Sequence, residues 1–122
     1  MTLRELYDEI GGNYDMALKV LRMEKLVDKH IRKLAQNTIF NDINTAAEAM
    51  DAPGLFESAH AIKGVCANLG LVELAEAASE ICEEFRPERE RKLTDAQALI
   101  KVHMINELYK KAVDAIARYE RS

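Results

Sequence analysis

The stretch HAIKGVCANLG, residues 60–70, decides how we interpret this chain of 122 residues. At 3.6 residues per turn, His60, Lys63 and Gly64 lie together on one face of a helix. The same stripe continues one turn further to Ala67. Apolar residues recur beside it at alternating spacings of four and three, which predicts a second stripe facing a core. We therefore expect the histidine beside the core and exposed to water. The apolar stripe comprises Leu55, Ala59, Ile62, Cys66 and Leu69.

The two glycines of this stretch are interpreted differently. Glycine costs about 1 kcal/mol relative to alanine inside a helix, so Gly64 needs a reason that helix stability does not supply. Room for a partner or for a phosphate, one turn after His60, is one such reason. Gly70 follows the last apolar position, where a left-handed residue commonly ends a helix. It predicts the end of the motif helix and a sharp hairpin.

The sequence on either side favours helix almost throughout. Long segments rich in Ala, Leu, Glu and Lys contain few interruptions, since the whole chain has only two prolines and five glycines. Two capping boxes, Thr2 with Glu5 and Thr94 with Gln97, predict helix starts. Apolar periodicity predicts six helices. The first is short and runs from Thr2 to the Gly11-Gly12 pair, and the second covers 15–36 with a bend near Met23. The others cover 39–50, 55–69, 71–85 and 94–120.

Turn signals between these helices predict the fold class. The segment Asp51-Ala-Pro-Gly54 is expected to reverse the chain before the motif helix, and the charged residues 88–92 are expected to form a solvated connection. We predict an all-α fold in one domain, residues 1–122. Residues 38–120 are expected to form an antiparallel up-down four-helix bundle, and residues 1–37 an N-terminal helical extension.

Composition and charge argue against several functions. The net charge is -4 with both signs interspersed, so there is no basic stripe for nucleic acid. No apolar run reaches the roughly 20 residues of a membrane span, and the first residues lack the apolar run of a signal peptide. We expect a cytoplasmic protein without a membrane contact. Cys66 and Cys82 are expected as reduced, partly buried thiols at different heights of the hairpin.

No arrangement of His, Cys, Asp and Glu shows the short repeated spacing that zinc or di-iron sites need. His30 and His103 have no such neighbours, and we expect both on the surface. We therefore expect no metal and no cofactor. Neither cysteine has a histidine at a spacing that suggests a catalytic pair, so a cysteine nucleophile is not expected.

Residues 60–70 resemble the signature of histidine-containing phosphotransfer (HPt) domains. That signature is usually written His-x-Leu-Lys-Gly followed four residues later by Leu-Gly, and here it reads HAIKG, VCAN, LG. Isoleucine replaces the leucine at position 62 and keeps its apolar role. Phe56 and Ala59 before the histidine, and a Leu-x-x-Leu-Ala helix after Gly70, agree with the family. The resemblance covers about residues 38–120.

The resemblance implies a carrier of phosphoryl groups in a two-component phosphorelay. It implies that His60 accepts a phosphoryl group from, or returns it to, the aspartate of a response-regulator receiver domain. Lys63 would steady the phosphate charge, and Gly64 would leave an opening for the active site of the partner. A sensor histidine kinase is the other implied partner, and Mg²⁺ is expected in the receiver domain only. The protein would then carry phosphate without turnover of its own, and would not be an enzyme.

Two details of the site stay open between alternatives. Many family members use a glutamine or glutamate on the following helix to hydrogen-bond the other ring nitrogen of the histidine. Here the residues level with His60 are about 79–83, of which Ser79 could accept that bond and Cys82 would accept it poorly. Ala67 and Asn68 could contact the receiver domain, but Asn68 could equally belong to the helix end.

Other functions remain as alternatives. The chain could be a helical binding module that regulates a receiver or kinase by docking, without phosphorylation. A helical bundle with a metal or cofactor in its core ranks lower, because the Glu-x-x-His pairs of di-iron bundles are absent. The sequence leaves the oligomeric state open.

Overall fold

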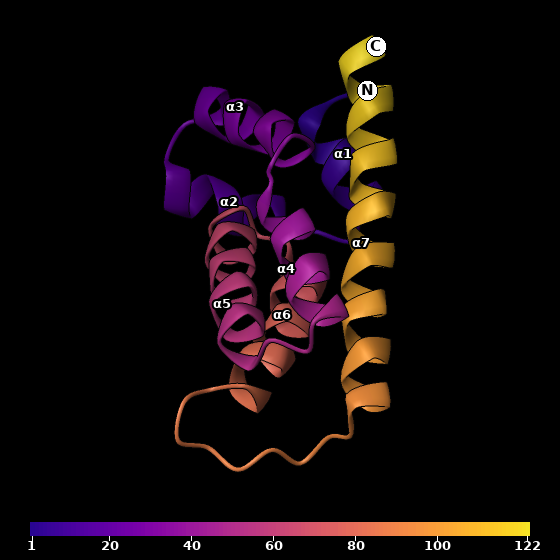
Figure 1. Cartoon of the computed structure of the whole chain (residues 1–122). Coiled ribbons are helices and arrows are strands. Elements are labelled where there is room, and N and C mark those ends of the chain that lie inside the picture. The colour runs from indigo at the N-terminus through magenta and orange to yellow at the C-terminus, as the bar shows by residue number, and fades with distance from the viewer.

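The computed structural model describes all 122 residues, in seven helices without a strand (Figure 1). The all-α prediction is confirmed. No helix combines the length and the apolar character needed to cross a membrane. The helices are α1 (Leu3–Glu9), α2 (Tyr14–Leu21), α3 (Glu24–Leu34), α4 (Ile39–Glu48), α5 (Ala52–Asn68), α6 (Val72–Glu84) and α7 (Asp95–Arg121).

Helices α4 to α7 enclose the part of the core that positions the motif. Helix α5 packs against α4 and α6, and α7 packs against the same two helices (Figure 1). The predicted apolar stripe of α5 is no more than 2% exposed at any of its five positions. Burying one Leu or Ile side chain stabilises a fold by roughly 1.5–3 kcal/mol, so this stripe fixes the rotation of α5 about its axis. The residues between these apolar positions must then face outward.

The N-terminal helices are attached to the second half of α7, which extends well beyond α5 and α6 (Figure 1). The Tyr119 hydroxyl donates a hydrogen bond of 2.5 Å to the Asp28 carboxylate on α3. The Tyr109 hydroxyl donates one of 2.9 Å to the Leu34 carbonyl oxygen. An ion pair between Arg118 and a glutamate of α1 adds a further link. The long helix therefore holds both groups of helices together.

The turn between α5 and α6 is locked against the start of α2. Gly70 adopts a φ of +68°, and a Cβ there would lie 2.2 Å from the carbonyl oxygen of Asn13. The Asn13 amide donates a hydrogen bond of 2.8 Å to the Gly70 carbonyl oxygen. The Tyr7 hydroxyl donates another of 2.8 Å to the Leu69 carbonyl oxygen. Only glycine suits this left-handed, crowded position, and the predicted helix end at Gly70 is confirmed.

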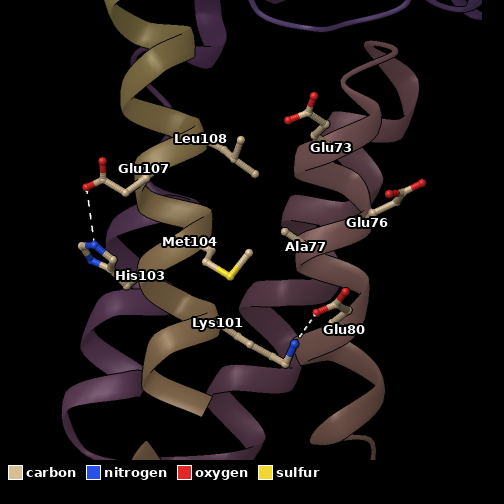
Figure 2. Close-up of a pocket in the computed structure, with 9 residues that line it drawn as sticks. All are labelled: Glu73, Glu76, Ala77, Glu80, Lys101, His103, Met104, Glu107 and Leu108. Atoms are coloured by element: carbon tan, nitrogen blue, oxygen red, sulfur yellow. Dashed lines mark hydrogen bonds and ion pairs between the residues drawn. The ribbon is translucent and has the colours of Figure 1, made fainter. Parts of the chain in front are cut away.

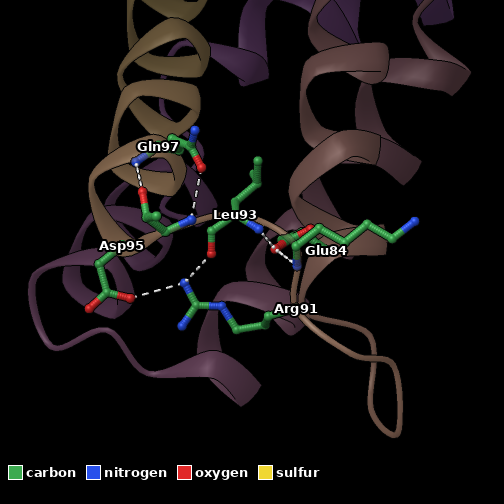
Figure 3. A network of polar contacts seen from close by, with 7 residues as sticks. Glu84, Arg91, Leu93, Asp95 and Gln97 are labelled. Atoms are coloured by element: carbon green, nitrogen blue, oxygen red, sulfur yellow. Dashed lines mark hydrogen bonds and ion pairs between the residues drawn. The ribbon is translucent and has the colours of Figure 1, made fainter.

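The charged connection between α6 and α7 is exposed, as predicted, and local polar contacts attach it to the ends of the two helices (Figure 3). A carboxylate oxygen of Glu84 accepts hydrogen bonds from the amides of Lys92 and Leu93, at 2.8 and 2.6 Å. Arg91 forms an ion pair of 3.0 Å with Asp95 in the first turn of α7. The capping box of Thr94 with Gln97 is present, and so is that of Thr2 with Glu5.

Two helix boundaries differ from the sequence-based expectation. The single bent helix over 15–36 is instead two helices, because Arg22 takes a left-handed φ of 70° and ends α2. The expected turn Asp51-Ala-Pro-Gly54 is the N-cap and first turn of α5. Proline is tolerated there because its missing N–H would have no partner in the helix. The chain leaves α4 instead at Met50, whose φ is 46°.

Candidate functional site

Helix α5 presents its motif residues to solvent. His60, Gly64 and Ala67 are exposed, and Lys63 is half-buried. The face opposite these residues carries the buried stripe described above, so the division of α5 into two faces is confirmed. The histidine therefore stands on the flank of the helix bundle and outside its core.

One ring nitrogen of His60 is occupied by the neighbouring helix and the other is free. The Cys82 Sγ lies 3.9 Å from Nδ1, whereas Nε2 has no hydrogen-bond partner in the chain. The Phe56 ring, one turn before on α5, stacks against the imidazole with centroids 5.9 Å apart and planes inclined by 22°. These contacts hold the imidazole ring on two sides and leave Nε2 free to contact a binding partner.

Two cations flank this position. The Arg86 guanidinium lies 5.5 Å above the Phe56 ring and donates hydrogen bonds of 3.1 and 2.6 Å to Glu83. Burial raises the pKa of the Cys82 thiol, and the charges of Arg86 and Lys63 oppose that rise. Arg86 is held by its ion pair with Glu83, whereas Lys63 forms no ion pair in the chain. A phosphoryl group there would add nearly two negative charges, which these cations would partly neutralise.

The surface around Gly64 is open. A Cβ built on this glycine meets no atom within 4 Å, outside the helix's own backbone. Glycine is unfavourable in a helix interior, and neither its backbone angle nor a close neighbour in this chain requires it here. Packing within the chain therefore gives no reason for a glycine at position 64.

The two candidates for orienting the imidazole are placed differently. Cys82 contacts Nδ1, whereas Ser79 is half-buried one turn earlier on α6 and makes no hydrogen bond to His60. Ser79 instead lines a hollow of about 250 Å³ together with Lys63 and Ala67. Asn68 is the last residue of α5, and it lines a different hollow with residues of α3.

Both cysteines are free, and both are completely buried rather than partly buried as expected. Burial raises the pKa of the Cys66 thiol to about 12, and burial is also the main cause of the raised pKa of Cys82. Both groups are neutral thiols near pH 7. Cys82 thus meets the histidine as a weak, uncharged hydrogen-bonding group. His30 and His103 are exposed, as predicted.

The sequence-based interpretation did not include Arg86 in the site. It lies one residue after the predicted helix over 71–85. Arg86 follows Cys82 by four residues but lies beyond Glu84, the last residue of α6, so helical spacing alone gives no signal for it. Phe56 was noted before the histidine, again four residues away, but its contact with the ring was not predicted.

A further hollow, of about 420 Å³, lies between α6 and α7 (Figure 2). Glu73, Glu76 and Glu80 line one side of it, and Met104 and Leu108 of α7 line the other. Lys101 bridges the two helices by an ion pair of 2.7 Å with Glu80. The hollow contains none of the motif residues, and no group of three or more His, Cys, Asp or Glu side chains in the chain could hold a metal ion.

Comparison with known families finds a match over most of the chain. The family model described as Hpt domain matches residues 22–119. The chain belongs to the Hpt domain family. The match contains the motif of α5, all of α6 and most of α7, whereas α1 and α2 lie before it. No curated protein and no solved structure matches the chain. Membership in the Hpt family implies phosphotransfer in two-component signalling, by phosphocarrier modules that are not enzymes.

Proposed function

We propose that this Hpt protein carries a phosphoryl group on His60, to or from the aspartate of a response-regulator receiver domain in a phosphorelay. The observation that carries the proposal is the state of the imidazole, which is exposed with Nδ1 against Cys82 and with Nε2 free. A sensor histidine kinase would load the relay. The direction of phosphoryl transfer depends on which partner carries the phosphoryl group with the higher transfer free energy.

The transfer follows from the geometry of the ring. A neutral imidazole with its proton on Nδ1 has a lone pair on Nε2. This lone pair attacks the phosphorus of an aspartyl phosphate, so that the Nε2–P bond forms while the P–O bond breaks. The bonding electrons leave with the aspartate oxygen, which becomes a carboxylate again. No proton has to move, and the return step reverses the same bonds.

Charge and access support the same assignment. Phosphoryl transfer depends mainly on positioning and on neutralising charge. Lys63 supplies positive charge from α5, and Arg86, which follows α6 and is paired with Glu83, supplies less. Gly64 leaves space for the active site of the receiver, and the exposed Ala67 and Asn68 extend that contact surface. Mg²⁺ would belong to the receiver domain, so the carrier itself would need no cofactor.

Cys82 acts in this proposal as a positioning residue. A neutral thiol can donate or accept a weak hydrogen bond, and in this proposal the Cys82 sulfur, 3.9 Å from Nδ1, accepts one from the ring form that carries its proton on that nitrogen. Neutral histidine must hold this proton on Nδ1 for Nε2 to attack. The thiol thereby takes the role that a glutamine or glutamate has in many members of the family.

The proposal includes an organisation for the whole chain. Residues 1–122 form one domain, in which 38–120 are an antiparallel up-down four-helix bundle and 1–37 are an N-terminal extension. The pairwise contacts of α4 to α7 support this arrangement. We also propose a cytoplasmic location, which suits partners that act inside the cell.

The test is a transfer assay with three proteins. Receiver domains carrying labelled phosphate are mixed with wild type, with His60→Gln, and with His103→Gln as a control for an exposed histidine on another helix. We expect label on wild type and on His103→Gln, and none on His60→Gln. Equal labelling of wild type and His60→Gln, or no labelling of either, would overturn the proposal. A module that works by docking alone would retain binding and regulation in His60→Ala.

A further inference from the structure

The hollow between α6 and α7 is a groove in the surface that the proposed carrier function does not use. It has a volume of about 420 Å³. Figure 2 shows Met104 and Leu108 of α7 pointing across it toward α6. His60 and Cys82 meet where α6 faces α5, whereas this groove lies where α6 faces α7. The groove is therefore separate from the surface that presents the histidine.

Apolar side chains line the bottom of the groove and continue along α7. Ala77, Met104 and Leu108 line it, and Met104 is 51% exposed. Ile100 precedes Met104 by one turn on the same face of α7 and is 62% exposed. Large apolar side chains exposed in neighbouring positions commonly mark an interaction surface. The row from Ile100 to Leu108 gives a partner about two helical turns to contact, roughly 12 Å.

The rim of the groove is acidic. Four carboxylates line it, those of Glu73, Glu76, Glu80 and Glu107. Lys101 is the one lysine of the lining, and it is already paired with Glu80 at 2.7 Å. Glu73 and Glu76 are exposed and have no ion-pair partner in the chain. Negative charge therefore remains uncompensated along the α6 side of the groove.

This charge determines which class of partner fits the groove. Carboxylates repel the phosphates of nucleic acids and of anionic lipids. A two-fold contact between two copies of the chain would join the same patch of both, so that the glutamates of α6 in the two copies would lie near each other. Lysine or arginine is the complementary charge. A protein segment that is apolar and basic fits both the bottom and the rim.

We propose that this groove binds an amphipathic helix of a protein partner, with its apolar side chains against Met104 and Leu108 and with lysine or arginine beside Glu73 and Glu76. A helix in such a groove is anchored by apolar residues three and four positions apart. The inference goes beyond the proposed carrier function. The bound helix leaves His60 accessible, so this partner and a receiver domain bind at the same time.

The experiment titrates the ¹⁵N-labelled full chain with a synthetic helical peptide that carries leucine along one face and lysine on both flanks. A second peptide has glutamate in place of every lysine. We expect the lysine peptide to shift the amide signals of residues 73–80 and 101–108 in the NMR spectrum. The glutamate peptide should leave them unchanged. Fluorescence anisotropy of labelled peptide gives the Kd for each variant.

Two variants of the groove have matched controls. Met104→Asn should raise the Kd at least about tenfold, since burial of a methionine side chain is lost. Its control is Met23→Asn, because Met23 is 54% exposed and lies before α3. The double variant Glu73→Gln, Glu76→Gln should raise the Kd about threefold at low ionic strength. Its control is Glu24→Gln, Glu48→Gln, which removes two exposed carboxylates elsewhere.

The outcomes separate this inference from the proposed function. Equal Kd values for groove variants and their controls, or equally tight binding of the glutamate peptide, would overturn the inference. If sedimentation shows that wild type self-associates and Met104→Asn does not, a second copy occupies the groove and the inference is rejected. His60→Gln should bind the peptide as wild type does, and saturating peptide should change phosphate transfer by less than about twofold. Peptide binding without any transfer by wild type rejects the carrier function alone.

Discussion

Two glycines six residues apart in the motif have opposite relations to the fold. Gly70 is left-handed, and a Cβ there would collide with the backbone of α2 at 2.2 Å. Gly64 is helical, and a Cβ there would meet nothing within 4 Å. The packed chain explains the first glycine and gives no account of the second.

This difference teaches that one short motif satisfies two separate requirements. Gly70, at the end of the motif, forms the turn that packs α5 against α2. His60 and Gly64, at its beginning, lie on a face of α5 that no other helix covers. In the proposed function, Gly64 is explained by the receiver domain that approaches this face. His60, exposed beside Gly64, is the group that we propose this partner reaches.

The largest effect on stability is expected from Gly70→Ala. A left-handed conformation costs a residue with a Cβ about 1–2 kcal/mol, and the contact with Asn13 adds to this strain, so we expect a loss of about 3 kcal/mol or more. Chemical denaturation would measure it. Transfer per folded molecule should stay near that of wild type, because His60 and Gly64 are unchanged. A loss below about 1 kcal/mol would contradict the assignment of Gly70 to the fold.

Gly64→Ala should separate stability from function most clearly. Alanine is the better helix former by about 1 kcal/mol, and its methyl group meets no neighbour, so the variant should be more stable than wild type. Its transfer rate should nevertheless fall at least about tenfold, because the methyl group enters the space that the receiver needs. Denaturation and single-turnover transfer are measured on the same sample. Unchanged transfer would show that the opening at Gly64 is not used.

Cys82→Ala should produce a smaller effect on transfer. Loss of the thiol contact lets the imidazole proton move from Nδ1 to Nε2, and we expect transfer to slow by roughly two- to fivefold. Nitrogen NMR of labelled histidine would report the ring form directly. Cys66→Ala is the control, because it removes the other buried thiol and leaves the His60 contact intact. A ring form that is the same in both variants would reject the positioning role.

The smallest effect is expected when acid weakens the hydrogen bond between Tyr119 of α7 and Asp28 of α3, which lowers the free energy of unfolding. The Tyr119 hydroxyl, with a further contribution from Arg32, lowers the pKa of the Asp28 carboxyl. This carboxylate contributes stability that is present above its unfolded pKa of about 3.9 and is lost as pH falls through the lower folded value. Unfolding measured from pH 6 down to pH 2 should show this loss in wild type. Tyr119→Phe should show less of it, and should transfer phosphate normally at neutral pH.

Much of the fold could be predicted because its local signals are strong. The stripe from Leu55 to Leu69, the helix end at Gly70 and both capping boxes follow from residue chemistry over a few positions. The break at Arg22 could not be predicted in this way. An ordinary residue there adopts a left-handed angle and ends α2, and no local residue signal marks the position. Pro53 was misleading, since proline suits both a turn and the first turn of a helix.

The site was predictable along α5 and less so across helices. The spacing of His60, Lys63 and Gly64 on one helix follows from the helical repeat alone. Which α6 residue reaches the imidazole depends on the offset between two helices, and the sequence left Ser79 and Cys82 as alternatives. The structure places Cys82 against Nδ1. The packing of α2 on the turn after α5 depends on tertiary contacts and was not predicted.

The most direct test of the account is to locate the phosphate after incubation with a phosphorylated receiver domain. Intact mass, followed by peptide mapping at neutral pH, would give both the number of phosphates and their position. The account predicts one phosphate per chain, on Nε2 of His60, stable in base and lost in acid. A phosphate on any other residue, or an unmodified chain beside a receiver that has lost its phosphate to water alone, would contradict it.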